Sequence, residues 1–322
     1  MDRRKFFKSA AAGAAALAAG AATCPARARE NKQLPTEAVG LLFDSTLCVG
    51  CKACVAACKE ANGMPPEFST QEQLWDTPLD LSGKTLNVIK VYRDGEAKVK
   101  DAEAGGYAFV KKSCLHCVDP SCVSACPVSA MTKDPKTGVV SYDKDACIGC
   151  RYCVAACPFG VPRFTYDQAV PQISKCQLCR QRWKDGKYAA CAEVCPTGAT
   201  LYGTVADIKQ EIARRKSLKP GTTAMFPRGK LGGPDQSYPN VVGRYVDHVY
   251  GEKELGGTQM MMLSGVPFEK LGYPQLPERS YAAESETLQR TLYGGLIAPL
   301  AFLGVLTYVA KRNVKPEEEN NG

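Results

Sequence analysis

Short apolar runs separated by polar or glycine-containing turns occupy much of the chain and predict short strands. Four of these strands are expected at residues 39–43, 87–92, 107–111 and 200–203. The sequence Asp134-Pro-Lys-Thr-Gly138 forms a turn between two further apolar runs and predicts a hairpin over residues 131–142. Residues 206–216 have the apolar spacing of an amphipathic helix. Strands and helices mixed in this way predict an α+β fold.

A charge-free run of twenty residues, 291–310, lies between Arg290 and Lys311-Arg312. As a helix it would be about 30 Å long, which matches the hydrocarbon thickness of a bilayer. A buried core helix is the alternative, but the terminal position and the flanking charges favour a transmembrane helix. The positive-inside rule then places the tail, residues 311–322, in the cytoplasm.

Residues 1–28 have the organisation of a twin-arginine signal peptide, with a basic start, an alanine- and glycine-rich run and an Ala-x-Ala cleavage site. A membrane helix is the alternative, but the run is too short and too weakly apolar to span a bilayer. Cys24 precedes the expected cut and would be removed, unless it carries a lipoprotein anchor. These segments predict a single-pass protein of the inner membrane with its folded domain on the periplasmic side.

Cysteine is the anomaly in the composition, with 17 residues in a chain of 322. Residues 147–158 read Cys-Ile-Gly-Cys-Arg-Tyr-Cys-Val-Ala-Ala-Cys-Pro, the spacing of bacterial two-cluster ferredoxins. Sixteen cysteines fall into four such groups, of which the second and fourth have a longer middle gap: Cys48, Cys51, Cys54 and Cys58; Cys114, Cys117, Cys122 and Cys126; Cys147, Cys150, Cys153 and Cys157; Cys176, Cys179, Cys191 and Cys195. The groups predict four [4Fe-4S] clusters with no ligand left over.

Disulfide bonds and zinc sites are the alternative uses of these cysteines. Exported proteins commonly form disulfides, but a disulfide framework does not explain the regular triplets or the proline that follows three of the four groups. Paired Cys-x-x-Cys units form structural zinc sites, which suits the fourth group alone. Both alternatives predict a colourless protein, whereas iron–sulfur clusters absorb visible light.

The fourth cysteine of a ferredoxin run binds the other cluster of its pair, which predicts crossed ligand sets. The second and third groups flank the hairpin and would form an inner unit, residues 107–166, inserted in an outer unit formed by the first and fourth groups. The two inner clusters are expected on Cys114, Cys117, Cys122 and Cys157, and on Cys126, Cys147, Cys150 and Cys153. The two outer clusters are expected on Cys48, Cys51, Cys54 and Cys195, and on Cys58, Cys176, Cys179 and Cys191.

Two interleaved ferredoxin-like units would therefore occupy residues 39–205. Residues 206–285 follow, rich in Gly, Pro and Tyr beyond their first helix, and we expect an extended segment that wraps the clusters or a partner. Within it, Met260-Met-Met262 is expected to form a packed strand. His116 lies between two ligands, but the cysteine set is already complete, so we expect it to pack or to hydrogen-bond.

The net charge of +8 does not indicate a nucleic-acid partner. Residues 1–28, with five Lys or Arg and one Asp, contribute +4 of it. Each cubane with four thiolates would add about −2, so the loaded mature chain would be mildly acidic. No nucleophile–base pair or nucleotide loop is apparent, and an iron with a full ligand set has no open position for a substrate. The expected activity is outer-sphere transfer of single electrons.

The cysteine groups, including Cys-x-His-Cys-x-x-Pro-x-Cys at 114–122, resemble those of four-cluster subunits of polysulfide, dimethyl sulfoxide and formate oxidoreductases. Segments 42–51, 117–122, 133–138 and 250–258, the export signal and the terminal anchor more closely resemble the ferredoxin-like subunit of hydrogenase-2-type nickel–iron hydrogenases. This resemblance implies as partners a hydrogenase large subunit, a hydrogenase small subunit and a multispanning quinone-reactive membrane subunit. Electrons would then pass from hydrogen to a menaquinone-type pool.

The alternative is the equivalent subunit of a molybdopterin enzyme such as formate dehydrogenase, which commonly lacks its own export signal. By analogy with that enzyme, the outer cluster pair would face the catalytic partner and the inner pair the membrane.

The crossed ligand sets predict which cluster a single substitution disturbs. Cys58→Ser should perturb the cluster of the fourth group, because Cys58 is expected to bind there, whereas the control Cys54→Ser should perturb the cluster of the first group. Electron paramagnetic resonance spectra of the reduced protein distinguish the two outcomes. Loss of the same signal in both variants would contradict the crossed pairing.

Overall fold

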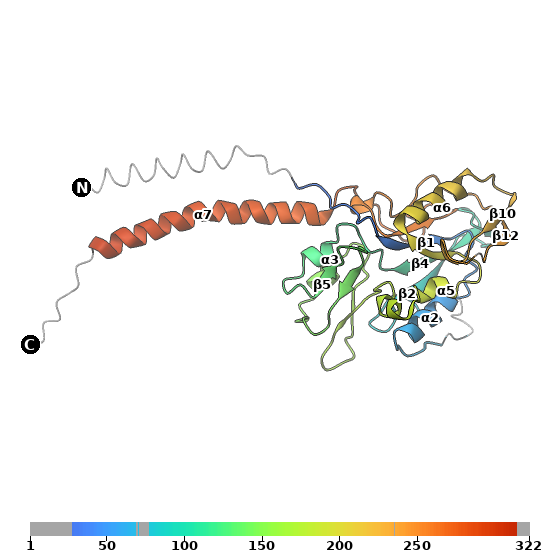
Figure 1. Cartoon of the computed structure of the whole chain (residues 1–322), viewed down its shortest axis with the longest axis horizontal. Coiled ribbons are helices and arrows are strands. Elements are labelled where there is room, and N and C mark those ends of the chain that lie inside the picture. Colours follow the sequence, from blue (N-terminus) through green and yellow to red (C-terminus); the bar gives the residue numbers. More distant parts are fainter. Residues whose placement is uncertain (1–27, 69, 71–76, 235, 314–322) are drawn as a thin grey trace, which may run out of the picture. The chain divides into compact units, whose positions relative to one another are not determined.

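The computed structural model describes residues 28–68, 70, 77–234 and 236–313 (Figure 1). The chain forms two compact units, of which one comprises residues 31–282 and the other residues 28–30 with 283–313. The predicted signal peptide lies outside the described residues except for its last residue, and so does the tail from residue 314. All sixteen cysteines of the four groups belong to the first unit.

The first unit combines short strands with short helices, as the apolar pattern predicts. Its strands are β1 (Val39–Asp44), β2 (Asn87–Arg93), β3 (Val99–Lys100), β4 (Gly106–Ser113), β5 (Met131–Lys133), β6 (Val140–Tyr142), β7 (Arg163–Phe164), β8 (Ile173–Ser174), β9 (Thr200–Thr204), β10 (Thr223–Phe226), β11 (Gly229–Lys230), β12 (Tyr238–Val241) and β13 (Met260–Leu263). Its helices are α2 (Ala53–Ala61), α3 (Ser121–Ser124), α4 (Tyr152–Ala156), α5 (Ala190–Glu193) and α6 (Val205–Ser217), with 3-10 turns η2 (Arg180–Asp185) and η3 (Glu254–Gly256). The predicted strands, hairpin and helix are confirmed, with boundaries that differ by at most two residues.

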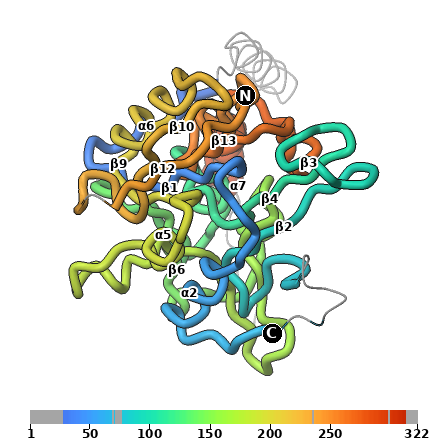
Figure 2. The backbone as a smooth tube through the Cα atoms, turned by 90° about the vertical axis from the view of Figure 1, so that its right-hand side faces the viewer, coloured from blue at the N-terminus to red at the C-terminus, as the bar shows by residue number. Residues whose placement is uncertain are grey.

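A four-stranded sheet in the order β11-β9-β1-β13 forms the centre of this unit. Strand β1 pairs antiparallel with β9 and parallel with β13. Figure 2 shows β1 beside β13, although more than 200 residues of chain separate them. The parallel pairing places the segment after α6 in the same unit as the cysteine groups. The sequence predicted a packed strand at residues 260–262 but not its pairing with β1.

Alternate residues of β1 pack on opposite faces of the sheet, as the period of a strand requires. Leu41 and Phe43 join the larger core cluster, which also contains Cys48 and Cys54. Leu42 faces the other way and packs with residues of α6. The three methionines of β13 alternate in the same manner, because Met260 and Met262 belong to the first cluster and Met261 to the second. Helix α6 therefore covers one face, and cysteines of the first and fourth groups pack on the other.

The short helices carry cysteines and pack in pairs. Helix α2, from the first cysteine group, packs against α5, from the fourth (Figure 1). Helix α3, from the second group, packs against α4, from the third. The structure thus brings together the same groups that the sequence pairs as outer and inner units.

A second sheet, in the order β2-β4-β3, connects the first cysteine group to the second. Strands β2 and β4 pair antiparallel over seven residues, with Ile89 opposite Lys111. Strand β4 ends at Ser113, so the sheet leads the chain directly into Cys114.

The segment after α6 packs around the second cysteine group. The Val118 N–H donates to the Gly257 carbonyl at 2.9 Å, which ties this segment to the loop after Cys117. Nearby, Tyr250 packs against Tyr273 and Phe268, with ring centroids 4.7 Å and 5.2 Å from its own. The segment therefore has a packed aromatic core, which its low apolar periodicity did not predict.

A buried ion network ties α6 to the end of β1. The Arg215 guanidinium, with no exposed surface, donates to Asp44 and to Glu211, each at 2.7 Å. Asp44 also accepts a bond of 3.0 Å from the Thr46 N–H, in the turn that leads to Cys48. The network therefore stabilises the turn between β1 and the first cysteine group.

Helix α7 (Tyr281–Asn313) begins ten residues before the predicted transmembrane run and includes Pro299. In the described part of the chain it is the one helix long and apolar enough to cross a membrane. Its large apolar side chains, from Leu292 to Tyr308, are exposed. Length, composition and exposure are all compatible with a membrane span.

Substitution of Arg215 should destabilise the first unit. Arg215→Met leaves the fully buried Asp44 carboxylate without its cation, which costs about 3–5 kcal/mol. The control Arg214→Met removes a partly exposed bond to the same Glu211 and should cost at most about 1 kcal/mol. Thermal unfolding of the purified full-length variants measures the difference. Equal melting temperatures in the two variants would show that the buried network does not stabilise the fold.

Candidate functional site

The same backbone turn occurs in all four cysteine groups. In each, the residue before the second cysteine has a positive φ: Gly50 (70°), His116 (51°), Gly149 (72°) and Leu178 (54°). Glycine adopts this conformation without strain, whereas histidine and leucine do not. The sequence therefore signals the turn at two positions, and only the structure reveals that the other two share it.

The first predicted ligand set surrounds one small cavity. Cys48, Cys51 and Cys54 come from the loop before α2 and from its first turn, and Cys195 comes from the loop between α5 and β9. These four cysteines line the cavity together with apolar side chains such as Phe43 and Ile89. Because β1 pairs with β9, a thiol more than 140 residues further along the chain reaches the loop at Cys48.

A second cavity contains another predicted set. Cys126, from the loop after α3, meets Cys147, Cys150 and Cys153 of the third group. Apolar side chains of Val128, Met131, Ile148 and Ile173 complete the lining. The crossing of the fourth cysteine into the neighbouring group, predicted from spacing, thus has a geometric counterpart at both cavities.

The other two predicted sets are recognisable from the charges that act on their thiols. Burial raises the pKa of Cys176 well above its usual value, and thiolates of Cys58, Cys179 and Cys191 raise it further. Burial likewise raises the pKa of Cys117, with added repulsion from Cys114, Cys122 and Cys157. All three thiols that act on Cys117 belong to its predicted set, and so do three of the four that act on Cys176; the fourth, Cys114, belongs to a neighbouring set.

Contacts between sets order them in a row. Cys54 of the first set packs in one apolar cluster with Cys191 of the second, Cys176 of the second with Cys114 of the third, and Cys122 of the third with Cys153 of the fourth. The order along the row is the set of Cys48, the set of Cys58, the set of Cys114 and the set of Cys126. Each neighbouring pair in this row is linked by one such interaction.

Backbone N–H groups point at several of the sulfur atoms. Gly149 donates to Cys147 Sγ and Leu178 to Cys176 Sγ, both at 3.4 Å. The fourth cysteines of two groups accept from a residue five positions later, Cys195 from Thr200 at 3.4 Å and Cys126 from Met131 at 3.5 Å. Such bonds stabilise thiolate charge and are one means by which proteins set cluster potentials.

The chemistry of the thiols suits metal binding. Burial raises the pKa of Cys48 and Cys58 to about 12, so as free thiols they would be neutral at physiological pH. A bound metal deprotonates its cysteine ligands. Among the described residues, no three His, Cys, Asp or Glu side chains are close enough to share one ion. Each thiol of a cubane binds a different iron, and the four cysteines that line one cavity at each of two sets fit such a cluster.

Lysines with little or no exposure accompany the cysteines, Lys111 fully buried and Lys133 half-buried. Lys111 has no exposed surface, and its Nζ lies 3.2 Å from Asn87 Oδ1. Burial opposes its charge, but the thiolates of Cys191, Cys54, Cys58 and Cys195 outweigh burial and raise its pKa. Lys133 donates to the Cys117 carbonyl at 3.0 Å, and burial lowers its pKa to about 8. These cations offset the negative charge that four thiolates would concentrate in each set.

His116 is fully buried and packs beside the hairpin, in agreement with the sequence prediction. Its Nδ1 accepts a hydrogen bond of 3.1 Å from the Val140 N–H. Burial lowers its pKa well below the usual value, and nearby Lys175 and Lys133 add to the shift. The ring is therefore neutral, and its role is to support the turn at Cys117.

Sequence reasoning missed the residues that surround the thiols. Lys111, Lys133 and Asn87 lie on strands whose apolar pattern predicts the strand but not the polar contacts. Their only sequence signal is a charged or amide residue within an otherwise apolar strand, which is common on solvent-exposed faces as well.

Comparison with known proteins agrees with this geometry. The family of 4Fe-4S dicluster domains matches residues 106–205. The hydrogenase-2 operon protein HybA of Escherichia coli O157:H7 is 46% identical, over 100% of this chain and 98% of that protein. Two iron–sulfur subunits of Escherichia coli (strain K12) are also similar. That of formate dehydrogenase-O is 31% identical over 88% of each chain. That of the nitrate-inducible formate dehydrogenase is 30% identical over 89% of this chain and 86% of the subunit.

The similarity to HybA extends over the whole chain, including the segment after α6 and helix α7. The cysteine sets, the dicluster domain and this full-length similarity lead to the same conclusion. The chain belongs to the family of iron–sulfur electron-transfer proteins that contains the hydrogenase-2 operon protein HybA and the iron–sulfur subunits of formate dehydrogenases.

Proposed function

We propose that this protein is an exported, membrane-anchored electron-transfer subunit that holds four [4Fe-4S] clusters in two interleaved ferredoxin-like units. The observation that carries the proposal is the row of four cysteine sets. The ligands are the sixteen cysteines in the crossed sets named above. When bound, clusters of this kind accept and release single electrons.

The chain's own residues supply what a path for electrons needs. Cys58, Cys179 and Cys191, in the second set of the row, are buried, and so is Cys114 in the third. Buried thiols and apolar neighbours keep water away from the middle of the row. The two cysteines that are exposed among the described residues, Cys51 and Cys150, belong to the two ends.

Each end of the row carries an exposed apolar side chain beside its exposed cysteine. Val49 lies next to Cys51 at one end, and Ile148 and Tyr152 flank Cys150 at the other. Apolar side chains around an electron-transfer site suit docking of a partner protein. We propose that the end at Cys51 faces the catalytic partner and the end at Cys150 the membrane subunit.

The proposed partners are the large and small subunits of a nickel–iron hydrogenase and a quinone-reactive integral membrane subunit. The identity of 46% to HybA over the full chain, against 31% to a formate dehydrogenase subunit, favours the hydrogenase. The alternative is a molybdopterin partner such as formate dehydrogenase, with the same path for electrons.

Helix α7 is proposed to anchor the chain in the inner membrane, with the cysteine groups on the periplasmic side. The basic residues Lys311 and Arg312 follow the apolar run and would remain in the cytoplasm. The twin-arginine signal supports this topology, because that route exports proteins already folded around their cofactors.

Affinity purification tests the identity of the partners. The chain carries a tag after Gly322, is extracted gently from membranes and is analysed by mass spectrometry, with nickel and molybdenum measured in the same sample. We expect a nickel–iron large subunit and nickel in matching amount, and reduction of the clusters by hydrogen. A molybdopterin subunit with molybdenum would instead establish the alternative partner and leave the cysteine sets unaffected.

Charge insertion in α7 tests the anchor. Leu296→Arg with Leu300→Arg places two charges in the middle of the apolar run, and each costs about 2.5–3.5 kcal/mol in a bilayer. In cells that lack the other subunits, we expect this variant to be released from membranes by alkaline extraction. The control Leu288→Arg with Gln289→Arg lies before the apolar run and should remain bound. Retention of both variants would contradict anchoring by this helix.

A further inference from the structure

Lys111 occupies an unusual position for a charged side chain. It lies in β4 with no exposed surface, and its Nζ contacts Asn87 Oδ1 at 3.2 Å. Asn87 in turn donates from Nδ2 to the Cys54 carbonyl at 2.9 Å. Four cysteines, once deprotonated, raise the pKa of Lys111 against the effect of burial. Ile89, which pairs with Lys111 across β2 and β4, lines the cavity of the first set.

The four thiolates belong to two different sets. Cys54 and Cys195 are members of the first set, and Cys58 and Cys191 of the second. A buried ammonium without an anion nearby is strongly destabilising. The position of Lys111 is therefore explained if it lies between two anionic sites and compensates both.

We propose that the buried positive charge of Lys111 raises the reduction potentials of both outer clusters. This inference rests on the proposed function, because it assumes clusters on the two outer cysteine sets. One-electron reduction makes a cluster more negative, and a fixed cation nearby stabilises the reduced form more than the oxidised form. A cation shared by two neighbouring sites also weakens the repulsion between an electron on one and an electron on the other.

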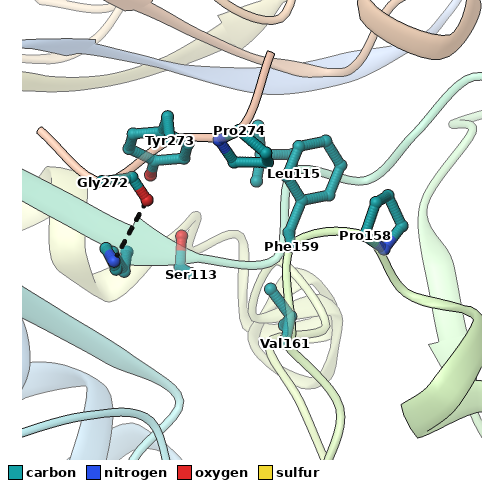
Figure 3. A pocket seen from close by; sticks show the side chains of 9 residues that line it. Ser113, Leu115, Pro158, Phe159, Val161, Gly272, Tyr273 and Pro274 are labelled. Atoms are coloured by element: carbon teal, nitrogen blue, oxygen red, sulfur yellow. Dashed lines mark hydrogen bonds between the residues drawn. The ribbon is translucent and has the colours of Figure 1, made fainter. Parts of the chain in front are cut away.

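The adjacent residue, Lys112, provides a matched control. Successive side chains of a strand point to opposite faces, and Lys112 donates to the Gly272 carbonyl at 3.4 Å (Figure 3). It lines a cavity of about 340 Å³ with Phe159 and Tyr273. Lys112→Met removes the same charge from the same strand, but on the side away from the outer sets.

The experiment is a redox titration of the purified complex followed by electron paramagnetic resonance. Signals of the two outer clusters are identified as those that Cys54→Ser and Cys58→Ser perturb. In Lys111→Met we expect the ratio of oxidised to reduced cluster, at a fixed ambient potential, to rise at least tenfold for both outer clusters. This corresponds to midpoint potentials that are lower by about 59 mV for a one-electron couple. The potentials of the inner clusters should change less, and Lys112→Met should leave the outer potentials unchanged.

A second variant covers the case in which Lys111→Met fails to assemble. Asn87→Asp keeps the lysine and adds a negative charge next to its ammonium, so it should shift the same two potentials in the same direction. Iron content of the unmodified protein, four atoms for each cluster, tests the proposed clusters separately. Unchanged outer potentials in assembled Lys111→Met, an equal shift of all four clusters, or an equal effect of Lys112→Met would overturn the inference.

Discussion

The antiparallel pairing of β1 with β9 is the interaction on which the other features depend. It brings the first and last cysteine groups together and lets α2 pack against α5. The chain between these strands must then leave and return at neighbouring points, and within it α3 packs against α4. Parallel pairing of β13 with β1 adds a third distant segment to the same sheet.

Concentrated negative charge is the second constraint. Sixteen thiolates in one compact unit would repel each other strongly. Lysines inside the unit and backbone N–H donors offset this charge. Lys111 and Lys133 are inside, beside cysteines of different sets. Both lysines lie on largely apolar strands, where water screens their charge less than at the surface.

The exposure of the cysteines differs along the row of sets. A path for electrons must exclude water from its middle and admit partners at its ends. The two exposed cysteines among the described residues, Cys51 and Cys150, lie in the two end sets, and three of the four cysteines of the second set are buried. Exposed apolar side chains lie near both exposed cysteines, where we propose that partner proteins dock.

The sequence alone was sufficient for the strands, the hairpin, α6 and the grouping of cysteines, because these depend on local spacing and apolar period. It also predicted the crossed sets, since the exchange of the fourth cysteine is a property of the ferredoxin run. Tertiary structure alone decided the pairing of β13 with β1, the order of the four sets and the burial of Lys111. Each of these depends on contacts between residues far apart in the chain, and no local pattern records which distant segments will share a sheet.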